Sequence, residues 1–466
     1  MYALKTPLAA FLLAAGLGAC ATMIDTNPEA RGIASQSVPD TPIDWQAVGA
    51  KVGDVQVGWA ARFNDPVLMR LIDEAQSNNR NIQAAAANVD RSWALAKQAG
   101  AALTPSLGLS AGAGGSGNGD GFSQGDINVG AQASWELDVW GRIRSGQQAT
   151  VSSAEAAEAD YRYARQSLAA GVARAYFISI EAAAQQQISE EVLATLTEVN
   201  RVVQVQYDNG VASQQDVSLA RADLASSADS LEATRGSKRD ALRALELLLG
   251  RYPGADIDVG LSLPANPSQP PAGLPAEILE RRPDIVAAER RIAGSIAGVN
   301  QAKAARLPSI SLTGSVGGAS DDLSSLLNPM NLAWQAASSL LVPVIDGGAR
   351  DAAVDIATAD QEAAVAAYAD AALTAFGEVE TALDQSQVLA RRKAALEVAE
   401  REAENALRIA NLRYSEGETD LTSVLAIQQR VEGSKSSLLS IQRLQLDQVL
   451  DLNMALGGDW QDPDQP

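Results

Sequence analysis

The stretch of sequence that decides the fold lies at residues 127–139 and reads Ile-Asn-Val-Gly-Ala-Gln-Ala-Ser-Trp-Glu-Leu-Asp-Val. Apolar side chains occupy every odd-numbered position from Ile127 to Val139, and the even positions hold polar residues or glycine. Because successive side chains of a strand point to opposite faces, the pattern predicts a strand with one apolar and one polar face. Such a strand suits a transmembrane barrel with a polar lumen, and equally a soluble half-buried sheet.

Three further segments carry the same alternation and complete two strand pairs. The first pair is separated by a Gly-rich loop at residues 114–125, the second by a loop around residues 321–328. The apolar positions of these segments are Leu107, Leu109, Ala111 and Ala113, then Ile310, Leu312 and Val316, then Leu332, Trp334, Leu340, Val342 and Val344. Four strands cannot close a barrel, and open sheet edges cannot lie in lipid. A membrane role would therefore require several copies of the chain to share one barrel.

The chain contains an internal duplication of about 205 residues. A shift of 207 positions places Tyr207 on Tyr414 and Gly210 on Gly417. The same register continues to the Leu-Gly pairs at 249–250 and 456–457. A period of this length is too long for a solenoid repeat and indicates two copies of a large supersecondary unit.

The duplication gives the domain organisation. Repeat 1 spans residues 61–262 and repeat 2 spans residues 276–460, each in the order helix, two strands, long helix, tight turn and return helix. A proline-rich linker at 263–275 separates them, and 461–466 form a tail. The two repeats predict two internal structural repeats built from the same elements.

The long helices begin after Gly141 and Gly348 and contain no proline for about 68 residues. At about 1.5 Å per residue each would be roughly 100 Å long, several times an ordinary globular helix. Apolar residues make up 46% of the chain but aromatic residues only 4%, so small side chains must fill the interior. The second long helix keeps a seven-residue apolar spacing, which indicates coiled-coil packing.

Composition excludes several classes of function. The formal net charge of −21 opposes binding to nucleic acid. The chain has no histidine and one cysteine, which removes the usual general base, the commonest metal ligand and any intramolecular disulfide. An envelope hydrolase using carboxylates stays as a minor alternative, although no fixed spacing pairs two acids with a nucleophile. We therefore expect no catalytic residues, no metal and no enzyme activity.

The N-terminus has the features of a secretory signal peptide at residues 1–19, with Lys5 before an apolar stretch. The run Leu17-Gly18-Ala19-Cys20 resembles the bacterial lipobox, so Cys20 is the expected site of lipidation and residues 20–60 form a lipidated N-terminal segment. An ordinary signal peptide with an incidental thiol is the alternative. Ala21 follows where aspartate would favour retention at the inner membrane, so we expect the outer membrane. No later run of about 18 apolar residues could span a membrane as a helix.

Five motifs carry a resemblance to a known family. They are Trp-Glu-Leu-Asp-Val-Trp-Gly-Arg at 135–142, Leu-Glu-Arg-Arg-Pro-Asp-Ile at 279–285, Leu-Pro-Ser-Ile-Ser-Leu at 307–312, Pro-Val-Ile-Asp-Gly-Gly at 343–348 and Ala-Leu-Gly-Gly-Asp-Trp at 455–460. Each is weak alone, but together they cover nearly the whole mature chain in the family's order. The chain resembles the TolC-like outer membrane factors, and the lipobox places it near the NodT-type efflux outer membrane lipoproteins.

The resemblance implies an α+β membrane protein, with a shared 12-stranded β-barrel of four strands per chain continued by a long α-helical periplasmic tunnel. It implies a homotrimer, a periplasmic adaptor protein, and an inner-membrane transporter that we expect to be proton-driven. The implied function is the exit duct of a tripartite efflux pump for small toxic compounds or drugs, anchored in the outer membrane, with no cofactor beyond covalent lipid on Cys20. A periplasmic adaptor lipoprotein is the main alternative, but it predicts one helical hairpin in a β-rich domain, not two.

In such a duct the informative places are the turns of the two hairpins, at residues 207–213 and 414–420. Their glycines should take the left-handed conformation, and Ser213 should form a capping box with Asp216. Five turn residues are the expected adaptor-docking positions: Gly210, Val211, Ser213, Gly417 and Thr419.

A gate is expected at the same end of the helices. Arg413, Tyr414 and Asp420 would make interhelix contacts that hold the periplasmic end closed, although Asp420 also suits a simple helix cap. The acidic composition further predicts a negatively biased lumen that favours cations.

Overall fold

The computed structural model describes residues 27–38, 42, 44–47, 58–118, 121–320 and 331–459, with side chains described except at 115–126. The signal peptide, Cys20, the loop at 321–328 and the tail lie outside these residues. The elements are α2 (Asn27–Ser37), η2 (Trp59–Phe63), α3 (Pro66–Asn78), α4 (Arg80–Ala101), β1 (Ser106–Asn118), β2 (Gly121–Leu137), α5 (Arg142–Asp208), α6 (Gln214–Leu249), η3 (Pro275–Glu277), α7 (Ile278–Arg281), α8 (Pro283–Ala304), β3 (Ser309–Ser320), β4 (Leu332–Leu341), α9 (Ala349–Ser415) and α10 (Leu421–Ala455).

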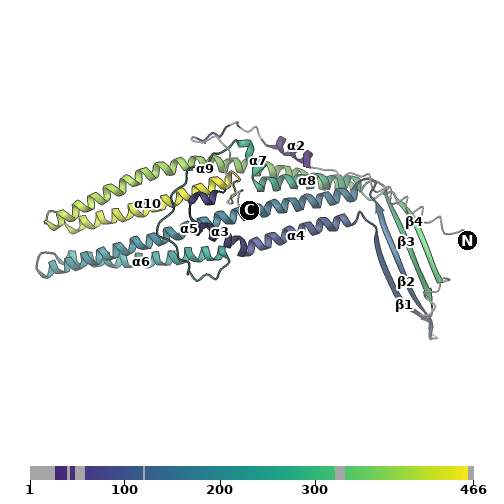
Figure 1. Cartoon of the computed structure of the whole chain (residues 1–466), viewed down its shortest axis with the longest axis horizontal. Coiled ribbons are helices and arrows are strands. Elements are labelled where there is room, and N and C mark those ends of the chain that lie inside the picture. The colour runs from purple at the N-terminus through teal and green to yellow at the C-terminus, as the bar shows by residue number, and fades with distance from the viewer. Residues whose placement is uncertain are drawn as a thin grey trace. The chain divides into compact units, whose positions relative to one another are not determined.

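The chain divides into two compact units (Figure 1). The sheet unit comprises residues 1–38, 88–158 and 287–370, and the hairpin unit comprises residues 39–87, 159–286 and 371–466. Each unit takes segments from both sequence repeats, so the duplicated halves are interleaved and not folded separately.

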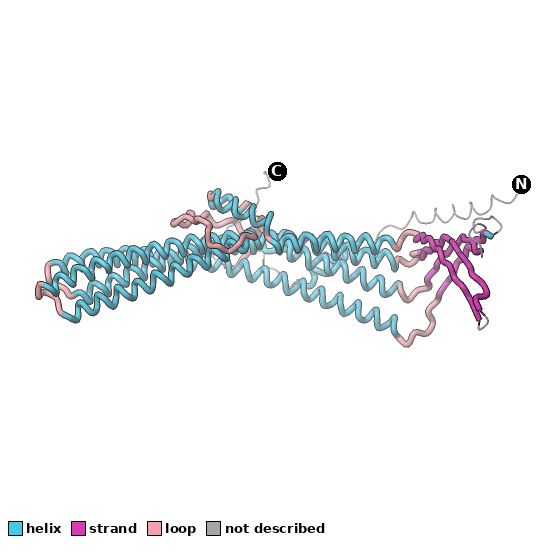
Figure 2. Tube along the Cα trace, turned by 90° about the horizontal axis from the view of Figure 1, so that it is seen from below, coloured by secondary structure: helices cyan, strands magenta, loops and turns pink. Residues whose placement is uncertain are grey.

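The sheet unit contains one antiparallel sheet in the order β1-β2-β3-β4, drawn in magenta in Figure 2. β2 and β3 pair across the two sequence repeats. The register aligns the apolar positions of all four strands: Leu109 lies opposite Ala131, Ala131 opposite Val316, and Val316 opposite Trp334. The alternation first seen at residues 127–139 therefore becomes one continuous apolar face. β1 and β4 each have a free edge among the described strands.

The strand boundaries differ from the prediction in two places. β1 and β2 continue to pair through much of the expected glycine-rich loop, as far as Asn118 opposite Gly121. At the other end β4 stops at Leu341, so Val342 and Val344 lie outside the strand. Pro343 between them has no N–H to donate to a neighbouring strand, which explains the early end.

The first helix of repeat 1 is also interrupted where the sequence predicted a continuous helix. α3 begins as expected, because Asp65 accepts hydrogen bonds from the backbone of Val67 and Leu68. It ends before Asn79, whose backbone is extended. The Asn79 side chain accepts from Asn81 N at 2.9 Å and donates to Leu248 O at 2.8 Å. Asparagine competes in this way with helical hydrogen bonding, and the break follows.

The long helices have the predicted lengths, with 67 residues in both α5 and α9. The heptad positions of α9 are confirmed as a packing seam, since Ala372, Ala375 and Val379 are fully buried. In the hairpin unit an aromatic cluster completes the core, with the rings of Phe63 and Phe177 centred 5.2 Å apart. Among the described residues, no helix has both the length and the hydropathy to cross a membrane.

Candidate functional site

The two hairpin turns lie at the same end of the hairpin unit (Figure 1). Gly210 and Gly417 both take the predicted left-handed conformation, with φ of 71° and 76°. In each turn the residue after the glycine donates to a carbonyl five positions back: Val211 N to Gln206 O at 2.8 Å and Glu418 N to Arg413 O at 2.9 Å. This hydrogen bonding satisfies the last carbonyls of α5 and α9 in the same way.

The return helices begin with side-chain caps. Ser213 and Asp216 form the predicted capping box, each accepting a hydrogen bond from the other's backbone N–H. Asp420 caps α10 by accepting from Ser423 N at 2.7 Å. That hydrogen bond to the charged form lowers the pKa of Asp420 below its usual value.

Tyr414 links the two hairpins. Its hydroxyl donates to Gln206 Oε1 at 2.9 Å, so α9 is joined to α5. Burial raises the pKa of Tyr414, with a further contribution from Asp216. The ring packs on an apolar cluster that includes Val217 of α6 and Leu421 of α10. The tips of both hairpins therefore share one small core.

The other predicted gate residues contact only their own turn among the described residues. Arg413 Nε lies 3.4 Å from Glu418 Oε2, and both side chains are more than half exposed. Asp420 serves as the cap already described. Of the docking positions, Val211 is 78% exposed. Tyr414 alone of the three gate residues bridges the hairpins of this chain, and the gate stays a prediction. Its partner Gln206 was missed, because nothing in the sequence distinguishes this glutamine from its neighbours.

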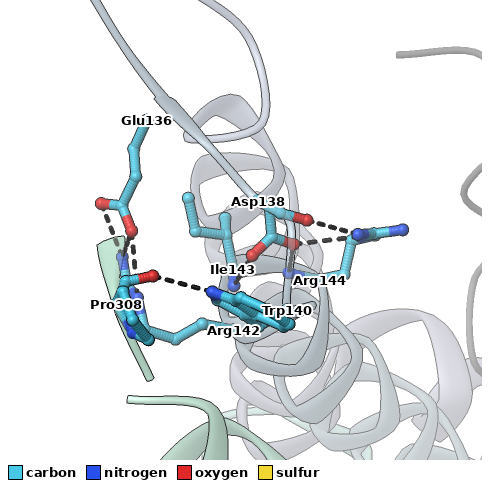
Figure 3. A network of polar contacts seen from close by, with 7 residues as sticks. All are labelled: Glu136, Asp138, Trp140, Arg142, Ile143, Arg144 and Pro308. Atoms are coloured by element: carbon cyan, nitrogen blue, oxygen red, sulfur yellow. Dashed lines mark hydrogen bonds and ion pairs between the residues drawn. The ribbon is translucent and has the colours of Figure 1, made fainter. Parts of the chain in front are cut away.

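The junction between β2 and α5 explains the motif at residues 135–142 (Figure 3). Asp138 accepts hydrogen bonds from Ile143 N and Arg144 N, both at 2.9 Å, and so caps the long helix. Glu136 receives two hydrogen bonds from Arg142 Nη2, each 2.9 Å long. A charged side chain at the strand end thus satisfies the first amides of the helix.

The two tryptophans of this motif tie the junction to neighbouring segments. Trp140 Nε1 donates to Pro308 O at 2.7 Å, and Trp135 Nε1 donates to Leu103 O at 3.0 Å. Repeat 2 has a parallel arrangement, in which Asp346 accepts from Gly348 N at 3.0 Å and Arg350 N at 3.3 Å. Both long helices therefore begin on an aspartate that follows a strand.

We predict that Asp138→Ala lowers the free energy of unfolding by about 1 to 2 kcal/mol, because it removes a helix cap and the partner of Arg144. The Asp138 side chain is 8% exposed, so its loss is poorly compensated by water. Asp346→Ala is the control: that side chain is 33% exposed, and a smaller loss is expected. Melting curves in detergent would compare them, and equal losses would contradict the prediction.

A charge network joins α5 to α10 within the hairpin unit. Arg443 pairs with both Glu181 and Asp447, and Arg174 pairs with Asp451 and lies 4.0 Å from Asp447. Three carboxylates thus share two guanidinium groups, which leaves one acid without a matching charge. Burial raises the pKa of Asp447 to about 6, partly opposed by Arg443 and Arg174.

The raised pKa of Asp447 predicts a pH-dependent stability. Its ordinary value is 3.8. The folded state therefore holds the proton more tightly, and this contribution is full below about pH 4 and lost as the pH rises through about 6, by less than about 1.4 kcal/mol per pH unit. Relative to Asp447→Asn, which keeps the shape without the titration, the native protein should lose stability between pH 4.5 and 7.5. A constant difference in melting temperature would refute this.

The described residues contain no group of three or more His, Cys, Asp or Glu side chains placed to hold a metal. The features with defined geometry are turns, caps and interhelix contacts.

Comparisons with known proteins agree with this geometry. The sequence model described as outer membrane efflux protein matches residues 71–251 and 274–458. The solvent efflux pump outer membrane protein SrpC of Pseudomonas putida is 33% identical over 408 residues, covering 85% of this chain and 86% of SrpC. The cation efflux system protein CusC of Escherichia coli is 31% identical over 416 residues, covering 87% and 88% of the two chains.

A solved structure extends the likeness to three dimensions. The MtrE outer membrane channel of Neisseria gonorrhoeae, in its open state, matches with a TM-score of 0.82 and 30% identity, covering 91% of this chain and 98% of MtrE. The predicted resemblance, outer-membrane location and channel fold are confirmed, and the adaptor alternative is wrong. The relatives are efflux ducts and not enzymes. The chain belongs to the outer membrane efflux protein family.

Proposed function

We propose that three copies of this chain form one duct, to which each contributes four strands of a 12-stranded barrel. The observation that carries the proposal is the sheet itself. Its register gives one apolar face across all four strands, with Leu109 85% and Trp334 74% exposed in the single chain. Barrels of this class need at least eight strands, and lipid tolerates no open edge. Joining β4 of one chain to β1 of the next closes both edges.

Cysteine cross-linking at the strand edges tests this arrangement. Ser110 on β1 and Gln335 on β4 both lie on the polar face, so Ser110→Cys with Gln335→Cys, and pairs shifted by two residues along β4, sample the interchain register. Oxidation should give covalent products that end at three chains. Each single variant is the control and should stop at dimers. Monomers throughout, or ladders beyond three chains, would contradict the closed trimer.

The duct is proposed to be lipid-anchored through Cys20, with residues 20–60 leading from the membrane to repeat 1. Two or three acyl chains anchor a protein stably, at about 0.8 kcal/mol per buried CH₂. Mass spectrometry of the mature N-terminal peptide should show acylation on Cys20. An unmodified peptide would remove the anchor from the account.

As the exit duct, the trimer would receive its cargo from a periplasmic adaptor and a proton-driven inner-membrane transporter. The relatives' names mention solvent, toluene, antibiotic and cation efflux. We propose small toxic compounds or drugs as the cargo of this chain. The absence of histidine gives no support to a metal route. A negatively biased lumen would show as cation preference in reversal potentials under a salt gradient, and anion preference would overturn it.

The hairpin turns are proposed as the adaptor-docking surface, and Arg413, Tyr414 and Asp420 as the gate. Because Asp420 also caps α10, its charge must be removed without losing the cap. Asp420→Ser does this, since serine is itself a good N-cap. Combined with Arg413→Gln, it should increase the open conductance of the isolated trimer. Unchanged conductance would remove Arg413 and Asp420 from the gate, with Tyr414→Phe then testing the bridge to Gln206 alone.

A further inference from the structure

A small polar cavity lies between α5, α6 and α10 in the hairpin unit, away from the turns described above. Its volume is about 200 Å³. Two carboxylates line it, Asp223 from the first hairpin and Glu432 from the second, and none of its lining residues is basic. Leu196 and Leu425 form part of the wall. The cavity is therefore an acidic chamber shared by both hairpins.

Glu432 has no counter-charge of its own. Burial alone raises its pKa, with no opposing contribution from a basic group or a hydrogen bond. A half-buried carboxylate in this position is unfavourable unless it is neutralised or paired. Asp223 lines the same cavity and adds a second negative charge.

Ser227 gives independent evidence for an occupant. It is 8% exposed, lines the cavity, and forms no hydrogen bond with any described residue. Buried serines elsewhere in these helices return their hydroxyl to a backbone carbonyl, as Ser179 does to Ala175 O at 2.8 Å and Ser434 to Val431 O at 2.9 Å. A buried hydroxyl without a partner is costly, so a ligand atom in the cavity would complete the site.

We propose that the cavity binds a hydrated divalent cation, Mg²⁺ in the first instance, between Asp223 and Glu432. Mg²⁺ keeps several of its waters and is commonly held by one or two carboxylates. At about 30 Å³ per water, the cavity has room for an ion with much of its water shell. The described residues offer no group of three metal-ligating side chains, which fits an ion that retains water. The sequence alone predicted no metal, because the two acids are 209 positions apart.

The bound ion links the two hairpins. α6 and α10 return from different turns, and their carboxylates repel each other when the cavity is empty of cations. The ion converts that repulsion into attraction and so stabilises the packing of the hairpins. The net charge of −21 also raises the local concentration of divalent cations around the chain.

Manganese binding to the purified full-length protein tests the proposal, with Mn²⁺ as the paramagnetic substitute for Mg²⁺. Electron paramagnetic resonance should reveal one saturable site per chain, with a dissociation constant on the order of 10⁻⁴ to 10⁻³ M, displaced by Mg²⁺. Glu432→Gln and Asp223→Asn should each weaken binding about tenfold or more. Ser227→Ala leaves the net charge unchanged and should weaken it about threefold.

Asp229→Asn is the matched control, because Asp229 is an exposed acid on the same helix and does not line the cavity. It changes the charge as much as Asp223→Asn does, and it should leave the site intact. Equal weakening by Asp229→Asn would mean diffuse attraction to an acidic protein and would overturn the proposal. No saturable site in the native protein would mean that the cavity holds water alone, and would overturn it as well.

Discussion

Arg282→Ala is expected to lower the free energy of unfolding by about 3 kcal/mol, among the largest effects of any single substitution in this chain. The Arg282 side chain is 3% exposed. It contacts Asp284 at 2.7 Å and Glu378 at 2.5 Å, and donates to Ala455 O at 3.3 Å. Its removal leaves two carboxylates facing each other in a partly buried site. The arginine thus connects the start of repeat 2 to the ends of α9 and α10 within the hairpin unit.

The neighbouring arginine provides the control. Arg281 is 35% exposed and lies 3.5 Å from Glu277 one helical turn away. Arg281→Ala should cost less than about 1 kcal/mol, because surface pairs contribute little. Thermal melts of both variants in the same detergent would decide between burial and charge. Equal losses would show that the position of Arg282 adds nothing to its charge.

Gly250→Ala is expected to destabilise the protein by about 2 to 4 kcal/mol through two independent penalties. Gly250 ends α6 with φ of 74°, a conformation that costs any residue with a Cβ atom. An added Cβ would also lie 2.7 Å from Asn78 O, a backbone atom that cannot move aside cheaply. The end of α6 is therefore packed directly on the end of α3.

Gly210→Ala separates these two penalties. Gly210 has a similar φ of 71°, but a Cβ there would meet nothing within 4 Å. It should show the conformational penalty alone, about 1 to 2 kcal/mol. If the two variants melted together, the close approach of Asn78 would have no energetic consequence.

Much of the fold follows from sequence pattern because the pattern has a single physical meaning. Alternation from Ile127 onward predicts the faces of β2, and the register of its neighbours confirms them. The proline-free stretch after Gly141 predicts α5 to within a residue at each end. Local patterns do not report contacts with distant segments, however. The break at Asn79 depends on a carbonyl of Leu248, 169 positions away, and no periodicity indicates it.

The candidate site divides in the same way. The left-handed glycines and the caps Ser213 and Asp420 are local features, and the sequence predicted each of them. The bridge from Tyr414 to Gln206 spans 208 positions, and only the packing of two hairpins creates it. The burial of Arg282 could not be predicted either, since its motif at 279–285 shows an arginine but not the carboxylates that surround it.

Planar-bilayer conductance of the purified protein tests the central claim, that this chain forms an efflux duct, most directly. The account predicts discrete single-channel steps, small because the tip is closed, from a preparation whose mass is that of three chains. A protein that stays monomeric and gives no conductance at concentrations where a porin control inserts would contradict it.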